Sequence, residues 1–471
     1  MRQENLLMTS WINSLYNHSP ILLQSSFLNL YAFKLNFERF GKKLGRLLVW
    51  LEETERWPPN DLTFYQEERL RTIIKHAYDT VPFYRDKMRS CKLHPHDIRT
   101  LDDLPKFPVT TKEDIKNNLQ RFISSKFTPR QLIHGHTSGT TGSPLDVYYD
   151  KGMVLMNNAV DWRQKRWAGL KLGERHAMLL GRIIVPIGQK RPPFWRMNYV
   201  HNQLWLSAFH MSDDNLQYYV DKLEHFRPKV IEGYPSTLYI LARYLNDKHL
   251  TLPLTAALTS SETLFPYQKE AIEKAFNCKI FDFYGHAERA IFATECSYHH
   301  GKHLNLEYGI TEFVDQKGIP GPAGAAGRMT GTSLHNLGMP MIRYATDDLT
   351  SLKEHACTCG RTLPLMEAVT TKHEDIVITP DGRWISPSVL THPFKPLKNI
   401  LESQIVQEKP DAVTVKIIKT PSYNQQDSSL LIAGLQERLG NAVEIKLDFV
   451  THIPRESSGK FRWVISKVPR P

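Results

Sequence analysis

The amino-acid sequence predicts an α/β protein with a large domain of helix-covered sheets and a small, mobile C-terminal α+β domain. Apolar strand candidates alternate with amphipathic helices up to about residue 350, which is typical of a largely parallel sheet with helices on its faces. Near the C-terminus the order becomes strand, helix, strand. We therefore expect an N-terminal helical extension over residues 1–60, the large domain over 61–373 and the small domain over 374–471.

The N-terminal extension contains a basic amphipathic segment over residues 33–53. Apolar residues recur there at spacings of three and four, with lysines and arginines between them, which predicts one helix. This helix either docks on the large domain or makes a peripheral contact with an anionic membrane surface. The prolines of Trp57-Pro58-Pro59-Asn60 end the helical pattern, and a second helix is predicted over 65–78.

The two domains differ in the order of their predicted elements. The strands of the large domain are expected at 177–185, 230–231, 254–258 and 279–283, and its helices at 215–226, 237–245 and 268–276. The small domain is expected to have strands at 412–419 and 443–450 on either side of a helix at 430–439.

The composition is that of a globular protein with an affinity for anions. Hydrophobic residues make up 41% and charged residues 23%, and no apolar run is long enough to span a bilayer. The N-terminus lacks the pattern of a signal peptide, so a cytoplasmic location is expected. A net charge of +11 suits a nucleotide substrate, an acidic carrier or an anionic surface, or serves solubility alone. Nucleic acid is not expected as a partner, because zinc-finger spacing and RNP-like strands are missing. The sequence does not fix an oligomeric state.

A run of glycine and hydroxyl residues stands at residues 136–144. This run, His136-Thr137-Ser138-Gly139-Thr140-Thr141-Gly142-Ser143-Pro144, contains two glycines and five hydroxyl residues. Glycines let backbone N–H groups approach an anion, and hydroxyls donate further hydrogen bonds, so the run predicts a phosphate cradle rather than a plain solvent loop. It does not end in Gly-Lys-Ser/Thr, which excludes a Walker-type nucleotide site.

Other segments along the chain strengthen this interpretation by their order. The segments are Ser260-Ser261-Glu262-Thr263-Leu264, Tyr284-Gly285-His286-Ala287-Glu288, Arg343-Tyr344-Ala345-Thr346-Asp347-Asp348 and Ser457-Ser458-Gly459-Lys460. With Val81-Pro82-Phe83-Tyr84-Arg85 and Glu232-Gly233-Tyr234-Pro235-Ser236, the set resembles the adenylate-forming ligase superfamily of acyl-CoA synthetases, luciferases and peptide-synthetase adenylation domains. Within it, the chain resembles the phenylacetate–CoA ligase branch, including relatives from capsular polysaccharide clusters, from about residue 60 to the end.

The resemblance implies a ligase that uses ATP and Mg²⁺ to join a carboxylic acid to AMP, releases pyrophosphate and then transfers the acyl group. The residues that it places around ATP are Thr137, Ser138, Gly139, Thr140, Thr141 and Gly142 at the phosphates, Ser261, Glu262, Tyr284 and Gly285 at the adenine, Asp348 at the ribose, and Lys372 ahead of the hinge. Glu288 is expected to hold Mg²⁺, and Lys460 to reach the carboxylate and the α-phosphate. Glu374 is the expected hinge residue of a rotating small domain.

The acyl acceptor stays open at this point. Asp347 stands where the family has glycine, Thr371-Lys372 replaces Gly-Arg, and Ala287 replaces a hydroxyl residue. The acceptor is CoA in the first interpretation, and an amine or hydroxyl on a sugar or carrier in the second. A third interpretation, from another class, is a non-catalytic homologue that binds a nucleotide or carrier. The carboxylic acid is not identified, and Trp162, Trp167 and Tyr234 are the aromatic candidates for its pocket.

A second constellation has the spacing of a metal site. Cys296 and His303 are followed by Cys357 and Cys359, and three thiolates with one imidazole suffice for a closed tetrahedral Zn²⁺ site. His299 and His300 compete with His303 as the imidazole ligand. The alternative is a set of unrelated buried cysteines.

Overall fold

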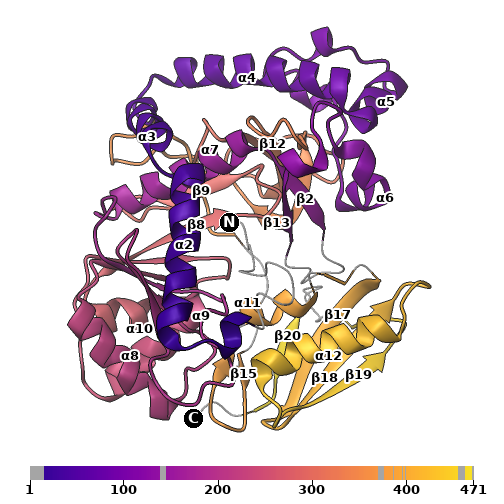
Figure 1. The fold of residues 1–471 in the computed structure, drawn as a ribbon. Helices are drawn as coiled ribbons and strands as arrows, with labels where there is room; N and C mark the ends of the chain where they lie inside the picture. Colours follow the sequence, from indigo (N-terminus) through magenta and orange to yellow (C-terminus); the bar gives the residue numbers. More distant parts are fainter. Residues whose placement is uncertain are drawn as a thin grey trace.

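The computed structural model describes residues 15–137, 145–369, 376–385, 387–394, 396–397, 399–454 and 462–468 (Figure 1). The large part of the molecule is built around a nine-stranded sheet of order β14-β10-β9-β8-β7-β6-β3-β5-β4. The inner strands are parallel, namely β5 (Gln203–Leu206), β3 (His176–Leu179), β6 (Val230–Gly233), β7 (Ala256–Ser260) and β8 (Lys279–Gly285). The outer strands run antiparallel to their neighbours, namely β4 (Trp195–Asn198), β9 (Phe292–Glu295), β10 (Lys302–Leu304) and β14 (Leu365–Met366).

Helices cover both faces of this sheet, so its parallel strands are largely buried on both sides. Ile231 and Ala257 pack against α8 (Asp213–Phe226), α9 (Pro235–Asp247) and α10 (Pro266–Phe276) on one face. The neighbouring residues Val230 and Ala256 belong to the core on the other face, which includes α7 (Lys151–Trp167). Successive residues of one strand thus serve two different cores.

Two smaller sheets complete the large part. β1 (Ile133–His136) and β2 (Asp146–Tyr149) form an antiparallel pair, and β11 (Gly309–Val314), β12 (Gly327–Ser333) and β13 (Tyr344–Thr350) form a second sheet. Ahead of β1 in the chain lie α5 (Pro82–Ser90), α6 (Lys112–Phe122) and short 3-10 turns. A short antiparallel pair, β15 (Val377–Ile378) with β16 (Trp384–Ile385), follows the large part in the chain.

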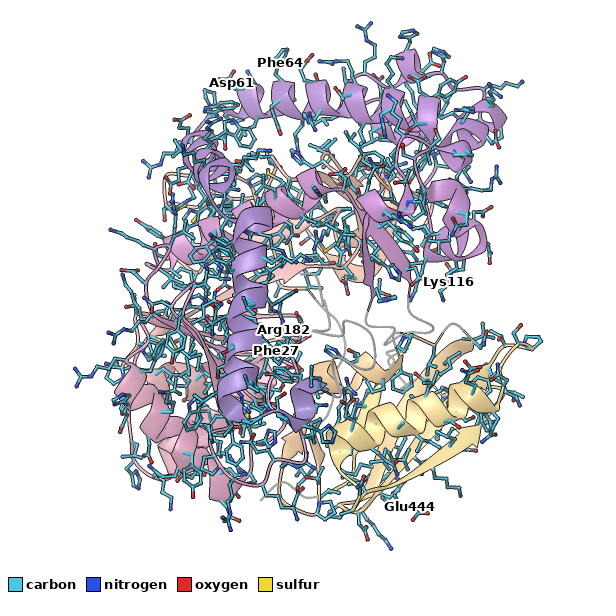
Figure 2. All side chains as sticks on the ribbon, viewed as in Figure 1. Phe27, Asp61, Phe64, Lys116, Arg182 and Glu444 are labelled. Carbon is cyan, nitrogen blue, oxygen red and sulfur yellow. The ribbon has the colours of Figure 1, made fainter. Side chains whose placement is uncertain are left out.

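The C-terminal part is a four-stranded sheet of order β19-β18-β17-β20 with one long helix. Its elements are β17 (Ile400–Lys409), β18 (Ala412–Lys419), α12 (Gln425–Leu439), β19 (Glu444–Phe449) and β20 (Val464–Ser466), preceded by α11 (Pro387–Leu390). Glu444, the first residue of β19, stands at the outer edge of this sheet (Figure 2). Arg383 joins this part to the large one, because its guanidinium donates to the carbonyls of Phe209 and Leu439. The mixed α/β architecture that the sequence predicts is confirmed.

The N-terminal segment differs from the single helix predicted over residues 33–53. It forms α2 (Ile21–Arg39) and α3 (Lys42–Thr54), which are separated at Gly41, whose φ of +93° ends one helix before the next begins. Docking on the large domain is observed: α3 buries Leu44, Leu48 and Leu51 in the core that includes α7. No helix in the described ranges combines the length and apolar composition needed to cross a membrane.

α4 (Pro59–Thr80) begins earlier than the predicted 65–78 helix, because a proline fits the first turn of a helix. Phe64 on this helix points outward in Figure 2 and is 63% exposed.

The strand predicted over residues 177–185 is too long. β3 ends at Leu179, and the chain then leaves the sheet at Gly181, where an added Cβ would lie 3.1 Å from side-chain atoms of Tyr234 and Val389. Ile184 and Val185 are nevertheless buried, because they pack with Leu28 of α2. An apolar run can be buried under a helix as well as within a strand. The end of the apolar run at Val185 therefore did not indicate where β3 ends.

Candidate functional site

The described residues of the candidate nucleotide site gather where the parallel strands end. In open α/β sheets, ligands bind beyond the carboxyl ends of such strands. Ser260 ends β7 and Gly285 ends β8, so the turns that follow them, with Ser261 and Glu288, lie at one edge of the sheet. β13 reaches the same place from the three-stranded sheet and brings Tyr344 and Asp348. The structure therefore brings together Tyr284, Gly285, Glu288 and Asp348.

Tyr284 and Asp348 are directly bonded. The phenol of Tyr284 donates a hydrogen bond of 2.7 Å to Asp348 Oδ2. Burial, together with the Asp348 carboxylate, raises the pKa of Tyr284 well above its usual value, so its proton stays on the phenol. This bond fixes a flat aromatic ring beside a carboxylate that can accept from ligand hydroxyls.

Glu288 is a buried carboxylate held by two donors. Tyr344 donates to its Oε1 at 2.5 Å, and His286 Nδ1 lies 3.0 Å from its Oε2. The N–H of Ile291 donates to His286 Nε2 at 3.2 Å, so Nε2 is the acceptor and Nδ1 carries the proton that is donated to Glu288. Burial alone would raise the pKa of Glu288, but the bonds from His286 and Tyr344 outweigh it and lower the pKa to about 2. The site thus contains an ionised carboxylate at neutral pH, which suits a hard divalent cation.

Arg343 positions the strand that carries two of these side chains. Its guanidinium makes a bidentate pair with Glu312, at 3.0 Å and 2.9 Å, and also donates to the carbonyls of Phe107 and Gly318. Arg343 itself has a φ of +48°. Planar, bidentate arginine bonds fix orientation as well as charge, so Arg343 sets the start of β13 just before Tyr344.

The hairpin of β1 and β2 approaches the same site. Tyr149 donates to the carbonyl of Ala287, and Arg289 lies over the Tyr149 ring with its Cζ 3.9 Å from the centroid. Thr137 pairs with Leu145: Thr137 N donates to Leu145 O at 3.0 Å, and Leu145 N donates to Thr137 Oγ1 at 2.8 Å. The Thr137 hydroxyl therefore accepts a bond that closes the hairpin, rather than standing apart from it.

The turn after β7 has a structural task of its own. Ser261 has a φ of +71°, a left-handed conformation that turns the chain away from the strand. Glu262 Oε2 accepts from Ser236 N at 3.0 Å, so the carboxylate lies at the N-terminus of α9, where the helix dipole favours it.

Several predicted site residues lie outside the described residues. These are Ser138, Gly139, Thr140, Thr141, Gly142, Lys372, Glu374 and Lys460. The sequence interpretation did not single out His286, Tyr344 or Arg343, although all three stand in the quoted motifs. Only His286 had a signal in the spacing, because it stands two residues from Glu288. Tyr344 meets Glu288 from another strand, 56 residues along the chain.

The Cys296, His303, Cys357 and Cys359 side chains lie together, with all four ligand atoms within 4.8 Å of one another. Cys296 Sγ is 3.8 Å from Cys357 Sγ, and Cys359 Sγ is 3.5 Å from His303 Nε2. Tetrahedral Zn²⁺ with bonds of about 2.3 Å to sulfur and about 2.05 Å to nitrogen would place sulfurs about 3.8 Å apart and sulfur about 3.5 Å from nitrogen. The donor set fits this metal in spacing.

The protonation of the cluster also fits a metal. His303 Nδ1 donates to Leu363 O at 2.8 Å, so Nε2 faces the cysteines with its lone pair. Burial lowers the pKa of His303 to about 4, which keeps the ring neutral. His299 pairs instead with Glu295 at 3.3 Å, and His300 lines a neighbouring pocket, so neither belongs to the cluster.

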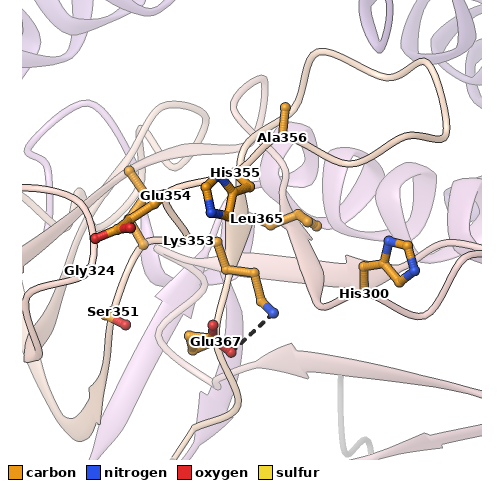
Figure 3. A pocket seen from close by; sticks show the side chains of 10 residues that line it. His300, Gly324, Ser351, Lys353, Glu354, His355, Ala356, Leu365 and Glu367 are labelled. Atoms are coloured by element: carbon orange, nitrogen blue, oxygen red, sulfur yellow. Dashed lines mark ion pairs between the residues drawn. The ribbon is translucent and has the colours of Figure 1, made fainter.

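Trp167, one of the aromatic candidates for the acid pocket, packs beside this cluster. Its ring centroid is 5.8 Å from that of His303, and Arg361 lies 4.1 Å over it. The pocket in Figure 3 has a volume of about 330 Å³ and adjoins the cluster through Ala356 and Leu365. Its polar rim, with Lys353 paired to Glu367 at 3.2 Å, is separate from the Tyr284 and Glu288 site.

Known proteins resemble this chain in sequence and in fold. The family model of the CapK C-terminal domain matches residues 377–467. Protein CapK of Staphylococcus aureus is 28% identical over 474 residues, covering 97% of this chain and 100% of that protein. The phenylacetate–coenzyme A ligase of Thermus thermophilus is 29% identical over 343 residues, covering 70% of this chain and 75% of the relative.

A solved structure shows the fold. The 2-hydroxyisobutyryl-CoA ligase in complex with 2-HIB-AMP and CoA superposes with a TM-score of 0.58 at 20% identity, over 88% of this chain and 92% of that one. The same ligase in its postadenylation state gives a TM-score of 0.57. The chain is therefore homologous to CapK and to the phenylacetate–CoA ligases, and it shares the fold of the 2-hydroxyisobutyryl-CoA ligase.

Proposed function

We propose that this protein activates a carboxylic acid with ATP through an acyl-adenylate and then transfers the acyl group to CoA. One observation carries the proposal: a buried, ionised Glu288 held by His286 and Tyr344 stands beside the Tyr284–Asp348 pair at the strand ends. An aromatic ring for a base, a carboxylate for ribose hydroxyls and a carboxylate for a cation together match the parts of a nucleotide. Homology to phenylacetate–CoA ligases supports the same reaction.

In the first half-reaction, a carboxylate oxygen of the acid attacks the α-phosphorus of ATP, and pyrophosphate leaves. Asp348 would accept from the ribose hydroxyls, and Tyr284 would flank the adenine. Glu288 would hold Mg²⁺, which offsets the negative charge on the phosphate oxygens. Lys460, from the small domain, would add a fixed positive charge at the α-phosphate, and the Ser138–Gly142 segment would bind the β- and γ-phosphates.

In the second half-reaction, the CoA thiolate attacks the acyl carbon and AMP leaves with both electrons of the broken C–O bond. We propose that the small domain, residues 374–471, rotates about Glu374 between the two steps, with Lys372 meeting a phosphate as a point charge. The overall products would be an acyl-CoA, AMP and pyrophosphate.

The alternative to thioester formation is transfer to an amine or hydroxyl on a sugar or carrier. It rests on the resemblance to relatives from capsular polysaccharide clusters and on the replaced Gly-Arg ahead of the hinge.

We also propose that Cys296, His303, Cys357 and Cys359 hold a structural Zn²⁺. The observed separations of 3.8 Å and 3.5 Å support it, as does the Nε2 of His303, which faces the cysteines. A closed site of this kind ties β9 and β10 to the Cys357–Cys359 turn and leaves no position for substrate.

The test is a screen of aryl, fatty, hydroxy and amino acids with ATP and Mg²⁺, in which pyrophosphate is measured with and without CoA. The proposal expects acid-dependent pyrophosphate with at least one class, and a thioester, detected by mass spectrometry, when CoA is present. An acyl-adenylate that accumulates unchanged with CoA would favour the amine or hydroxyl acceptor. An absence of acid-dependent pyrophosphate across the panel would contradict the proposal.

A further inference from the structure

The outward face of the β1–β2 hairpin carries two histidines and an aspartate. His134 and His136 alternate along β1, and Asp146 is the direct partner of His136 on β2. Residues two apart in a strand share a face, so the three side chains point to the same side. The register of the hairpin therefore brings together three metal-ligating groups.

The opposite face explains why this arrangement is rigid. Val147 and Tyr149 are buried there, 0% and 3% exposed. Gly135 lies beneath the Tyr149 ring, because an added Cβ would be 2.7 Å from Tyr149 Cε2. A hairpin packed on this face presents His134, His136 and Asp146 outward from a fixed backbone.

The ligand atoms are close enough to share one ion. His134 Nε2 lies 2.9 Å and His136 Nδ1 lies 2.8 Å from the same oxygen, Asp146 Oδ1. Octahedral bonds of about 2.1 Å, set at right angles, place neighbouring ligand atoms about 3.0 Å apart. Two imidazoles and one carboxylate are a known donor set for divalent transition metals.

The polar atoms of the cluster also favour a bound cation. His136 Nδ1 is buried and makes no hydrogen bond to any described residue, although Asp146 Oδ1 is 2.8 Å away. A buried ring nitrogen without a hydrogen bond costs free energy. A cation between the nitrogen and the carboxylate would remove this cost. Asp146 is only 9% exposed, whereas His134 is 42% exposed, so an ion can enter from the His134 side.

We propose that His134, His136 and Asp146 bind one divalent transition-metal ion, distinct from the cysteine cluster and from the Mg²⁺ assigned to Glu288. The ion would join the two strands directly beside Thr137 and Leu145, where the hairpin closes. Its remaining positions would hold water. The site requires neither ATP nor a carboxylic acid, so it is tested independently of the proposed function.

The test is a metal titration of untagged, chelator-treated full-length protein with Co²⁺ by calorimetry, without nucleotide. We expect His134→Ala to weaken one class of binding at least about ten-fold, and His134→Ala/His136→Ala to abolish it. Cobalt–thiolate absorption from the cysteine cluster should be unchanged in both variants, which shows that the fold is intact. The control is His225→Ala, an exposed histidine on α8, which should bind Co²⁺ like the wild type.

Asp146→Asn provides a second variant with nearly the same volume, and it should weaken the same class of binding. Equal stoichiometry and affinity in the wild type, His134→Ala and Asp146→Asn would mean a hydrogen-bonded His–Asp cluster only, and would overturn the proposal.

Discussion

Replacing Glu288 by glutamine removes the buried charge and keeps the volume of the side chain. The folded protein lowers the pKa of this group from 4.5 to about 2, which corresponds to about 3 kcal/mol in favour of the ionised form. Glutamine still accepts from Tyr344, but its amide is a poor ligand for a hard cation. We expect pyrophosphate release to fall about 10²-fold or more, and the Mg²⁺ concentration for half-maximal rate to rise.

The same substitution has a stability effect whose sign follows from the pKa. A carboxyl with a lowered pKa stabilises the fold above its unfolded value of 4.5, and this contribution is lost as the pH falls through about 2. Urea unfolding should therefore show Glu288→Gln less stable by up to about 3 kcal/mol at neutral pH, with a smaller difference below pH 4.5.

Glu270→Gln, at an exposed position on α10, is the matched control. It should change neither pyrophosphate release and its Mg²⁺ dependence nor the stability in urea. Wild-type pyrophosphate release with unchanged Mg²⁺ dependence in Glu288→Gln would refute the assignment of Glu288 as the cation ligand.

Three further variants probe the other groups. Lys460→Ala should lower pyrophosphate release by about 10²-fold or more without changing the melting temperature, and unchanged release would refute its role. Tyr284→Phe removes the donor to Asp348, a hydrogen bond worth about 1.5–3 kcal/mol, so the KM for ATP should rise by about ten-fold or more. An unaltered KM would show that the Tyr284–Asp348 pair does not take part in nucleotide binding. Cys357→Ser should lose about one zinc per chain by elemental analysis, together with thermal stability. Wild-type protein that is as stable without metal as with it would exclude the structural zinc.

The parallel sheet could be predicted because its strands carry their own signal. Residues 279–283 contain Ile280, Phe281 and Phe283 and follow an amphipathic helix, and the observed β8 begins at Lys279. β17 and β20 escaped prediction because their pairing depends on partners far along the chain, such as Ile405 with Val464. Local periodicity does not encode such partners.

A site residue could be predicted from the sequence where its role depends on a single motif. Contacts between separate motifs could not. Tyr284 and Asp348 stand in separate motifs, and their contact of 2.7 Å required the three-stranded sheet to bring β13 alongside β8. The donor role of Tyr344 depends on the same tertiary arrangement, so it could not follow from spacing alone. The choice of His303 over His299 depended on strand β10, which turns His303 inward and leaves His299 beside Glu295.

The central claim, attack on the α-phosphate of ATP, is tested most directly by the fate of the nucleotide in a single reaction with an accepted acid. With ATP labelled at the α-phosphate, the account predicts a labelled acyl-adenylate before the acceptor is added, labelled AMP afterwards, and pyrophosphate in equal amount. Labelled ADP with inorganic phosphate would show attack at the γ-phosphate and would contradict it.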